Sequence, residues 1–207
     1  MSDAGDGRRF APAAARNRDP ILSVLARILP EGALVLEVAS GTGEHAIHFG
    51  SRLPGITWQP TDPDEQARRS IDAWRADAGL DAILPAKVLD VRAPEWPVTR
   101  ADAVVAINLV HISPWSAFQG LLMGAARVLP AGGLLFLYGP YRRGGSHTAP
   151  SNEAFDQSLR QRDPAWGVRD LEHVVETASS QGLRLIEVVE MPANNLSVVF
   201  ANEGATG

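Results

Sequence analysis

Short apolar runs alternate with segments of helical periodicity along most of this chain. The apolar runs are bounded by glycine, proline and charged residues, and they cover residues 33–38, 56–60, 86–89, 103–109 and 134–138. Hydrophobic positions three or four residues apart predict the helices between them, over residues 20–29, 44–53, 64–79 and 115–129. Strands that alternate with helices in this way are typical of a parallel, doubly wound sheet with right-handed crossovers.

The end of the chain departs from this alternation. Helical stretches near residues 153–161 and 170–180 precede two apolar runs, 183–189 and 196–201, which have no helix between them. Two strands joined so closely are most simply an antiparallel hairpin. We therefore predict an α/β fold, a single doubly wound, mostly parallel, Rossmann-like sheet with a C-terminal antiparallel hairpin.

Local signals also predict where elements and the domain begin and end. Pro20, which follows an aspartate, is typical of a helix start, so the first helix is expected to begin there. Residues 139–152 combine glycines with polar side chains after a buried strand, which predicts a long loop that closes over a ligand as a lid. The domain is expected to span residues 10–203, with a flexible N-terminus (1–9) and a flexible tail (204–207).

Composition narrows the functional classes. With 207 residues and 45% hydrophobic content the chain can bury one sizeable core. The formal charge of −5 gives no overall attraction to nucleic acid, and the absence of cysteine excludes disulfides, thiolate zinc sites and cysteine nucleophiles. No apolar stretch has the length of a signal peptide or a membrane span. These features predict a soluble cytoplasmic protein without nucleic-acid or membrane partners, and they leave the oligomeric state open.

The most informative segment joins the first strand to the following helix. It reads LVLEVASGTGEHA over residues 34–46, an apolar run that contains Glu37 and breaks into a turn at Gly41 and Gly43. Such a turn lets a ligand approach the backbone, and the NH groups at the start of the next helix face the same crevice. A carboxylate at the strand end disfavours a pyrophosphate but favours the ammonium and sulfonium groups of S-adenosylmethionine. The alternative is that the two glycines only make a tight turn.

Polar residues follow the ends of three further strands. In an open α/β sheet these ends meet at one crevice, where ligands bind. Asp62 lies 19 residues after Gly43, the spacing at which an acidic residue meets ribose hydroxyls in nucleotide-binding βαβ units. Asp90 is expected to accept the adenine amino group while the Val91 NH contacts a ring nitrogen, and Asn108 ends the next strand.

Each of these residues also has a structural interpretation. Asp62 is placed to cap the helix that begins near Asp64, and capping does not exclude ribose contact. Asp90 precedes residues that favour a turn, and Asn108 suits a buried amide that satisfies backbone groups at a strand end. Their joint position at successive strand ends favours the ligand-binding interpretation.

The turn and the strand-end residues together resemble the class I S-adenosylmethionine-dependent methyltransferases. Residues from about 9 to 202 resemble, more closely, a methyltransferase-like family catalogued as a domain of unknown function; the matching stretches include LEVASGTGEHAIHF, WQPTDPD, INLVHISPW, GGLLFLYGPY, TAPSNEAFDQSLRQRDPAWGVRD and MPANNLSVVF. Methyltransferases of this class usually have glycine at the first position of the turn, where this chain has Ala39. The resemblance implies that S-adenosylmethionine contacts Asn17, Glu37, Ala39, Gly41, Thr42, Gly43, Asp62, Pro63, Asp90, Val91 and Asn108.

The methyl acceptor is expected to be a small molecule. A hydroxyl acceptor needs a base, and His111, three residues beyond Asn108 at the mouth of its loop, is placed to serve as one; a histidine bonded to backbone in that turn is the alternative. Candidate substrate residues in the predicted lid are Tyr141, His147, Ser151 and Asn152. Arg16, beside Asn17, is a candidate contact for the methionine end of the cofactor. No metal site is predicted, since His45 and His48 lack a third ligand.

Two other functions remain open. The pattern Gly41-x-Gly43-x-x-Ala46 with Asp62 also satisfies the dinucleotide fingerprint, so an NAD(P)-dependent oxidoreductase is the first alternative. Glu37 and the predicted C-terminal hairpin argue against an oxidoreductase. The second alternative is a non-catalytic module that binds S-adenosylmethionine for regulation or assembly.

Overall fold

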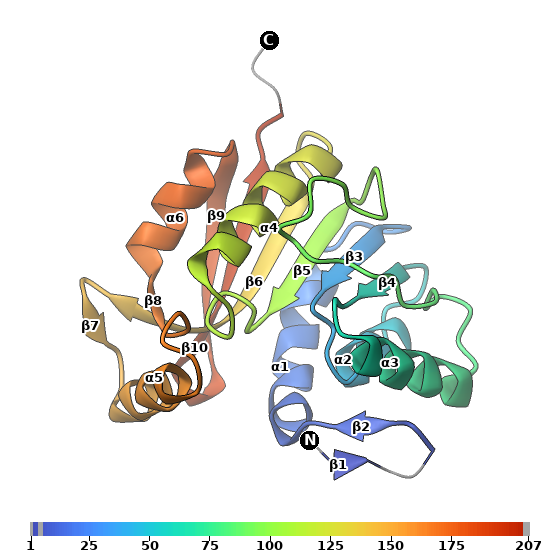
Figure 1. The fold of residues 1–207 in the computed structure, drawn as a ribbon. Coiled ribbons are helices and arrows are strands. Elements are labelled where there is room, and N and C mark those ends of the chain that lie inside the picture. The colour runs from blue at the N-terminus through green and yellow to red at the C-terminus, as the bar shows by residue number, and fades with distance from the viewer. Residues whose placement is uncertain (1, 4–5, 205–207) are drawn as a thin grey trace.

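The computed structural model describes residues 2–3 and 6–204 and contains one main sheet. Its strands lie in the order β4 (Thr57–Thr61), β3 (Leu34–Val38), β5 (Ala103–Ile107), β6 (Leu134–Arg143), β10 (Asn195–Asn202) and β9 (Leu183–Met191) (Figure 1). The first four are parallel, and β10 runs antiparallel to both of its neighbours. This arrangement confirms the predicted α/β sheet with a C-terminal antiparallel hairpin.

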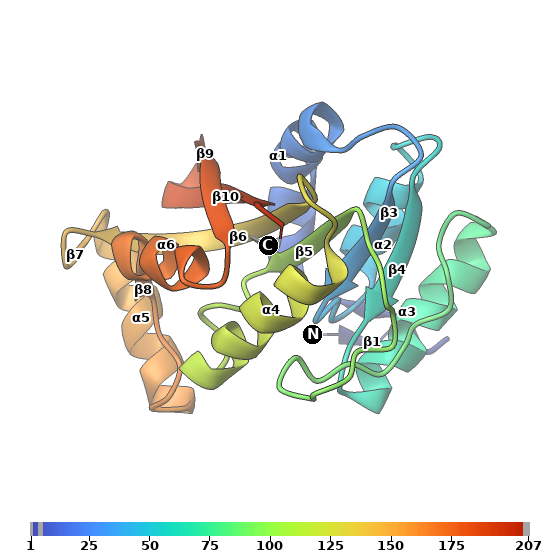
Figure 2. The same ribbon diagram turned by 90° about the horizontal axis from the view of Figure 1, so that it is seen from above.

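Helices cover both faces of this sheet. They are α1 (Pro12–Ile28), α2 (Glu44–Gly50), α3 (Glu65–Ala78), α4 (Trp115–Val128), α5 (Pro150–Arg162) and α6 (Leu171–Ser179), with a short 3-10 turn at Pro192–Asn194. Apolar residues of α1 and α2 pack with one set of alternating strand residues, and those of α4 and α6 pack with the other set. Figure 2 shows the sheet between these two layers. Every helix of the described residues is too short or too polar to cross a lipid bilayer.

The first helix begins earlier than the sequence predicts. α1 starts at Pro12, and Pro20 lies inside it, so the predicted start at residue 20 is wrong. Pro12 occupies the first helical turn, where a missing NH costs nothing, and the alanines after it favour the helix. The extra turns carry Ala13, Arg16 and Asn17 to the carboxyl end of the sheet.

The predicted strand at 86–89 does not form. Only two isolated bridges, Trp58 to Ile83 and Thr61 to Lys87, connect this part of the chain to β4. Pro60 and Pro85 lack the NH groups that a continuous ladder requires. The segment nevertheless runs beside β4 and delivers Asp90 to the carboxyl end of the sheet.

The predicted lid over residues 139–152 is largely ordered strand. β6 continues to Arg143, turns at Gly144 and Gly145 and returns as β7 (Ser146–His147), while β8 (Arg169–Asp170) pairs with the far end of β6. Both glycines have positive φ angles, which suits a two-residue hairpin turn. Arg142 pairs with Asp170, so this segment is pinned in place.

The N-terminal segment packs on α3. β1 (Ser2–Asp3) pairs with β2 (Arg9–Phe10), the Phe10 ring packs edge-on to Trp74, and the Arg9 NH donates to the Ser70 hydroxyl. Of the two predicted flexible ends, residues 1, 4–5 and 205–207 lie outside the described residues.

Candidate functional site

The turn after β3 contains three residues with positive φ angles, Ala39 (55°), Gly41 (60°) and Gly43 (90°). A Cβ added at Gly43 would lie 2.8 Å from the Ile71 Cα, so α3 approaches this turn closely only because residue 43 is glycine. A Cβ added at Gly41 would meet only the Ala39 carbonyl oxygen, at 4.0 Å. Gly43 therefore serves packing, whereas the backbone at Gly41 borders open space.

Asp62 connects the end of β4 to this turn. Its Oδ2 accepts a hydrogen bond from the Gly41 NH and its Oδ1 accepts one from the Asp64 NH, both at 2.9 Å. Burial raises the pKa of the Asp62 carboxyl, and the two hydrogen bonds oppose that shift. Asp64, rather than Asp62, caps α3 by accepting from the Gln66 NH. Because each carboxylate oxygen has a second lone pair, Asp62 keeps acceptor capacity beside the turn. The carbonyl of the adjoining Pro63 accepts from the Arg68 guanidinium.

Glu37 lies inside the sheet rather than in the crevice. Its side chain is 2% exposed, and its Oε2 accepts a hydrogen bond of 2.9 Å from the Trp58 indole. Burial raises the pKa of Glu37 to about 7, while the hydrogen bonds from Trp58 and Ser40 lower it. At neutral pH this carboxyl is therefore only partly ionised, so it attracts a cation less strongly than a fully charged carboxylate at the strand end would.

Asp90 forms the turn that its sequence context suggests. Its carbonyl accepts from the Ala93 NH, and its carboxylate pairs with the Arg92 guanidinium at 2.6 Å. The hydrogen bonds from Arg92 lower the pKa of Asp90, so the side chain is ionised and, at 40% exposure, accessible. The next residue, Val91, is buried. Both remain candidates for contact with an adenine.

A cavity of about 690 Å³ lies beside the carboxyl end of β5 and the middle of β6. Its walls come from α1, α5, these two parts of the sheet and the turn of the C-terminal hairpin, and they consist of Ala13, Arg16, Asn17, Asn108, Tyr138, Pro140, Ser151, Asn152, Phe155, Pro192, Ala193 and Asn195. Asn108 has a φ of 60°, which turns the chain sharply at the end of β5. The cavity thus joins two predicted cofactor residues, Asn17 and Asn108, to two predicted substrate residues, Ser151 and Asn152.

Hydrogen bonds hold the start of α2 against α1. The Thr42 hydroxyl donates to Glu44 Oε2 at 2.9 Å, and the same oxygen accepts from the Ala11 NH. Asn17 Oδ1 lies 2.8 Å from His45 Nε2. Burial lowers the pKa of His45 to about 4, so the neutral ring donates from Nε2 to Asn17. This bond fixes the Asn17 amide at the cavity wall.

The expectation that His111 lies at the mouth of its loop is wrong. The side chain is fully buried, its ring packs edge-on to Tyr141 at 4.8 Å, and the Gly139 backbone lies against it. Burial, with a further contribution from Arg169, lowers the pKa of His111 to about 3. The ring is therefore absent from the wall of the cavity, although Asn108, three residues before it, belongs to that wall.

Tyr141 and His147 also lie away from the cavity. β6 alternates its side chains, so Tyr138 and Pro140 line the cavity on the α1 face, whereas Tyr141 packs with the core on the α4 and α6 face. His147 lies 3.6 Å from the Asp156 carboxylate and is absent from the cavity wall. The structure therefore does not bring these two predicted substrate residues to the wall of this cavity.

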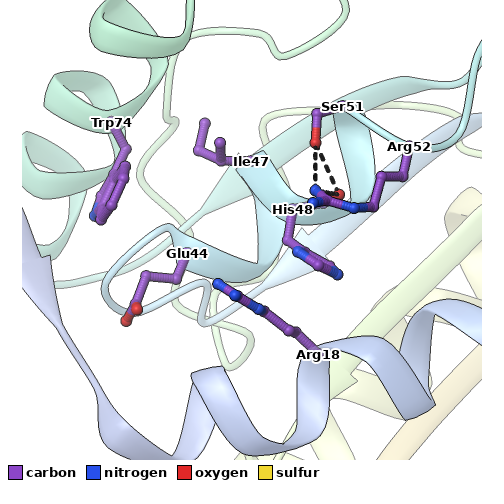
Figure 3. A pocket seen from close by; sticks show the side chains of 7 residues that line it. All are labelled: Arg18, Glu44, Ile47, His48, Ser51, Arg52 and Trp74. Carbon is purple, nitrogen blue, oxygen red and sulfur yellow. Dashed lines mark hydrogen bonds between the residues drawn. The ribbon is translucent and has the colours of Figure 1, made fainter.

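A smaller cavity of about 130 Å³ lies between α1, α2 and α3. Figure 3 shows the Arg18 side chain reaching between Glu44 and His48, with Trp74 on the opposite wall. His48 Nε2 lies 2.8 Å from Asp19 Oδ1, so this histidine faces a carboxylate of α1. The described residues contain no group of three histidine or carboxylate side chains that could hold a metal ion.

Two kinds of comparison relate this chain to known proteins. The model of the family described as "Protein of unknown function (DUF938)" matches residues 8–202. Among solved structures, an O-methyltransferase family 2 protein from Planctomyces limnophilus, crystallised with apigenin, superposes with a TM-score of 0.77 at 18% identity and covers 98% of this chain and 62% of its own.

Two further solved structures carry a ligand of the cofactor type. Human N-acetylserotonin methyltransferase in complex with S-adenosylmethionine has a TM-score of 0.73 at 16% identity and covers 93% of this chain and 53% of its own. CalO1, a methyltransferase of calicheamicin biosynthesis bound to S-adenosylhomocysteine, has a TM-score of 0.70 at 22% identity, with coverages of 93% and 55%. This chain therefore spans little more than half the length of these structures, and at such identities the likeness shows a shared fold.

Proposed function

The chain belongs to the family described as "Protein of unknown function (DUF938)", and from its methyltransferase fold and the geometry of its crevice we propose that it transfers a methyl group from S-adenosylmethionine to a small-molecule acceptor. The observation that carries the proposal is the bond between Asp62 and the open turn at Gly41, which lies at the carboxyl end of the same sheet as the large cavity. The solved structures with S-adenosylmethionine or S-adenosylhomocysteine support this choice of cofactor.

Different residues at the crevice contact different parts of the cofactor. Asp62 accepts hydrogen bonds from the ribose hydroxyls, Asp90 and the Val91 NH contact the adenine, and the Gly41 turn admits the amino-acid part. Asn17 and Asn108 contact the cofactor from the wall of the acceptor cavity, to which both belong. Ala39, Thr42, Gly43 and Pro63 shape the backbone around these contacts, and Glu37 lies beneath the turn.

The cavity side chains contribute to methyl transfer by positioning the acceptor relative to the methyl group. When bound, S-adenosylmethionine supplies a methyl group on a positively charged sulfur. The acceptor atom forms the new bond to that methyl group, the electron pair of the broken carbon–sulfur bond stays on sulfur, and the acceptor proton passes to water. The cavity contributes by holding the acceptor in line, a contribution that reaches about 7–11 kcal/mol in well-oriented reactions.

Calorimetric titration with S-adenosylhomocysteine tests the proposal. We expect one-site binding to the full chain and no enhancement of NADH fluorescence. Binding of NADH without S-adenosylhomocysteine would replace the proposal with the oxidoreductase alternative.

Catalysis requires a separate measurement. The protein is incubated with S-adenosylmethionine and a panel of small acceptors, and products are detected by mass as a gain of one CH₂ unit. Binding without any such product across a broad panel would favour the non-catalytic binding module.

A further inference from the structure

The large cavity has an uneven charge. Arg16 is the one residue of its wall that carries a full charge at neutral pH, because burial raises the pKa of Tyr138 and the remaining residues are amides, a hydroxyl and apolar groups. Aspartate and glutamate are absent from the wall. Arg16 is exposed, and within the described residues it takes part in none of the ion pairs. A wall with a single cation and no anion favours a ligand with a negative charge.

Two helix starts add to this preference. Ala13 and Ser151 belong to the first turns of α1 and α5, and both line the cavity. The residues that precede these helices, Ala11 and Ala149, have no side-chain oxygen to act as a cap, and their carbonyls accept from the NH groups of Ala14 and Asn152. Since the first helical residues are prolines, the NH groups of Ala13 and Ser151 are the ones left at these two starts, and at α1 the Glu44 carboxylate already accepts from the Ala11 NH. Helix starts carry a partial positive charge. The first turn of α5 contains Glu153, which is exposed and lies outside the cavity wall.

The remaining wall suits a flat apolar body. Phe155, Tyr138, Pro140 and Pro192 present apolar surface. The Asn152 amide nitrogen donates to the Thr148 hydroxyl and to the Asn194 carbonyl, so its oxygen is the atom left to receive a ligand donor. These side chains come from three separate elements and enclose a volume in the usual range for small-molecule sites.

We propose that this cavity binds an aromatic carboxylate and that Arg16 pairs with the carboxylate group. The inference rests on the proposed function, because it names the class of acceptor that the same site takes. The apolar wall receives the ring, Asn152 receives a ring hydroxyl or amine, and the charge at Arg16 selects anionic over neutral acceptors. A guanidinium suits this role because it binds a carboxylate through two parallel hydrogen bonds.

The test compares two probes of nearly equal shape, 4-hydroxybenzoate and 4-hydroxybenzamide, by calorimetry on the full chain with and without S-adenosylhomocysteine. We expect the carboxylate to bind at least tenfold more tightly than the amide. Arg16→Gln should weaken carboxylate binding about tenfold and leave amide binding unchanged. Arg27→Gln is the matched control, because Arg27 lies on the same helix and its exposed side chain pairs with Glu187 away from the cavity.

Several results would overturn the assignment. Equal affinity for the two probes, or an Arg16→Gln variant that binds both as the wild type does, would remove the anion preference. An Arg16→Gln variant that loses S-adenosylhomocysteine but keeps 4-hydroxybenzoate would place Arg16 at the methionine end of the cofactor. Failure of the wild type to bind S-adenosylhomocysteine refutes the proposed function separately, because the probes are also titrated without it.

Discussion

The Asp62 carboxylate accepts a 2.9 Å hydrogen bond from the Gly41 backbone NH and so ties the end of β4 to the turn that follows β3. These two residues lie 21 positions apart, yet the parallel pairing of β3 with β4 brings them together. The same carboxylate also receives the Asp64 NH. Asp62 therefore orders the backbone of the crevice while keeping lone pairs available for a ligand.

Replacing Asp62 tests its role toward the cofactor. We expect Asp62→Ala to weaken S-adenosylhomocysteine binding by roughly 1 to 3 kcal/mol, the scale of a lost charged hydrogen-bond acceptor. Calorimetry measures the affinity, and circular dichroism establishes that the variant is folded. The matched control is Asp64→Asn, which alters the neighbouring carboxylate that caps α3. Unchanged affinity in a folded Asp62→Ala variant would contradict the assignment.

Gly41 and Gly32 provide a matched pair for the open turn. Both have positive φ angles, of 60° and 74°, so alanine introduces similar backbone strain, about 1 kcal/mol, at either position. Neither added Cβ collides with the protein. We expect Gly41→Ala to reduce S-adenosylhomocysteine affinity at least tenfold and Gly32→Ala to leave it unchanged, as measured by calorimetry with thermal unfolding in parallel. Equal affinities for the two variants would show that no ligand approaches Gly41.

Local patterns allowed the turn and the strand ends to be predicted. The run from Leu34 to Gly43 contains both the apolar residues that predict a strand and the glycines that predict a turn. Parallel pairing of the strands then places the residues that end each strand at the same edge of the sheet. The start of α1 escaped prediction because Pro12 and Pro20 both suit a first helical turn, and sequence alone does not choose between them. The segment at 86–89 has strand composition, but Pro60 on its partner strand limits the ladder.

The sequence predicts only some of the residues that line the large cavity. Ser151 and Asn152 were found because they follow a glycine-rich segment, but Phe155 and the hairpin turn at Pro192 carry no local signal that they share a wall with α1. The burial of His111 depends on Gly139 and on Tyr141, which lie about 30 residues later. Such long-range packing decides whether a histidine is a base or part of the core.

The raised pKa of Glu37 predicts that the protein releases protons when S-adenosylmethionine binds. Its pKa of about 7 means that near pH 7 about half of the molecules hold a proton there. A cation bound close to the turn lowers that pKa, so the wild type should release up to about half a proton per ligand. Calorimetry in two buffers of different ionisation enthalpy at pH 7 measures the number.

Two variants separate this effect from other titrations. Glu37→Gln should abolish the release. Trp58→Phe removes a hydrogen bond that lowers the Glu37 pKa, so it should shift the maximum of proton release to higher pH. A release that persists in Glu37→Gln would assign the proton to another group, and no release in the wild type would place Glu37 beyond the reach of the cofactor charge.

His111 predicts a loss of stability in acid. The folded protein keeps this ring neutral down to a pKa of about 3, because burial dominates and Arg169 adds to it, while Asp156 opposes the shift. The unfolded chain protonates the ring below its ordinary value of 6.5 and so binds more protons in this window. The free energy of unfolding should therefore fall by about 2 kcal/mol for this residue between pH 7 and pH 5. Urea unfolding at the two pH values measures this change in the free energy of unfolding.

Two variants test whether the His111 ring is its source. His111→Leu should reduce the fall in the free energy of unfolding between pH 7 and pH 5 by that amount, whatever its effect at pH 7. Tyr141→Phe alters the packing partner without a titration in this range, so it should keep the full fall. His45, whose pKa is lowered to about 4, accounts for a part of the fall that survives in His111→Leu. An identical pH dependence in the wild type and His111→Leu would mean that the ring is protonated, or solvated, in the folded protein.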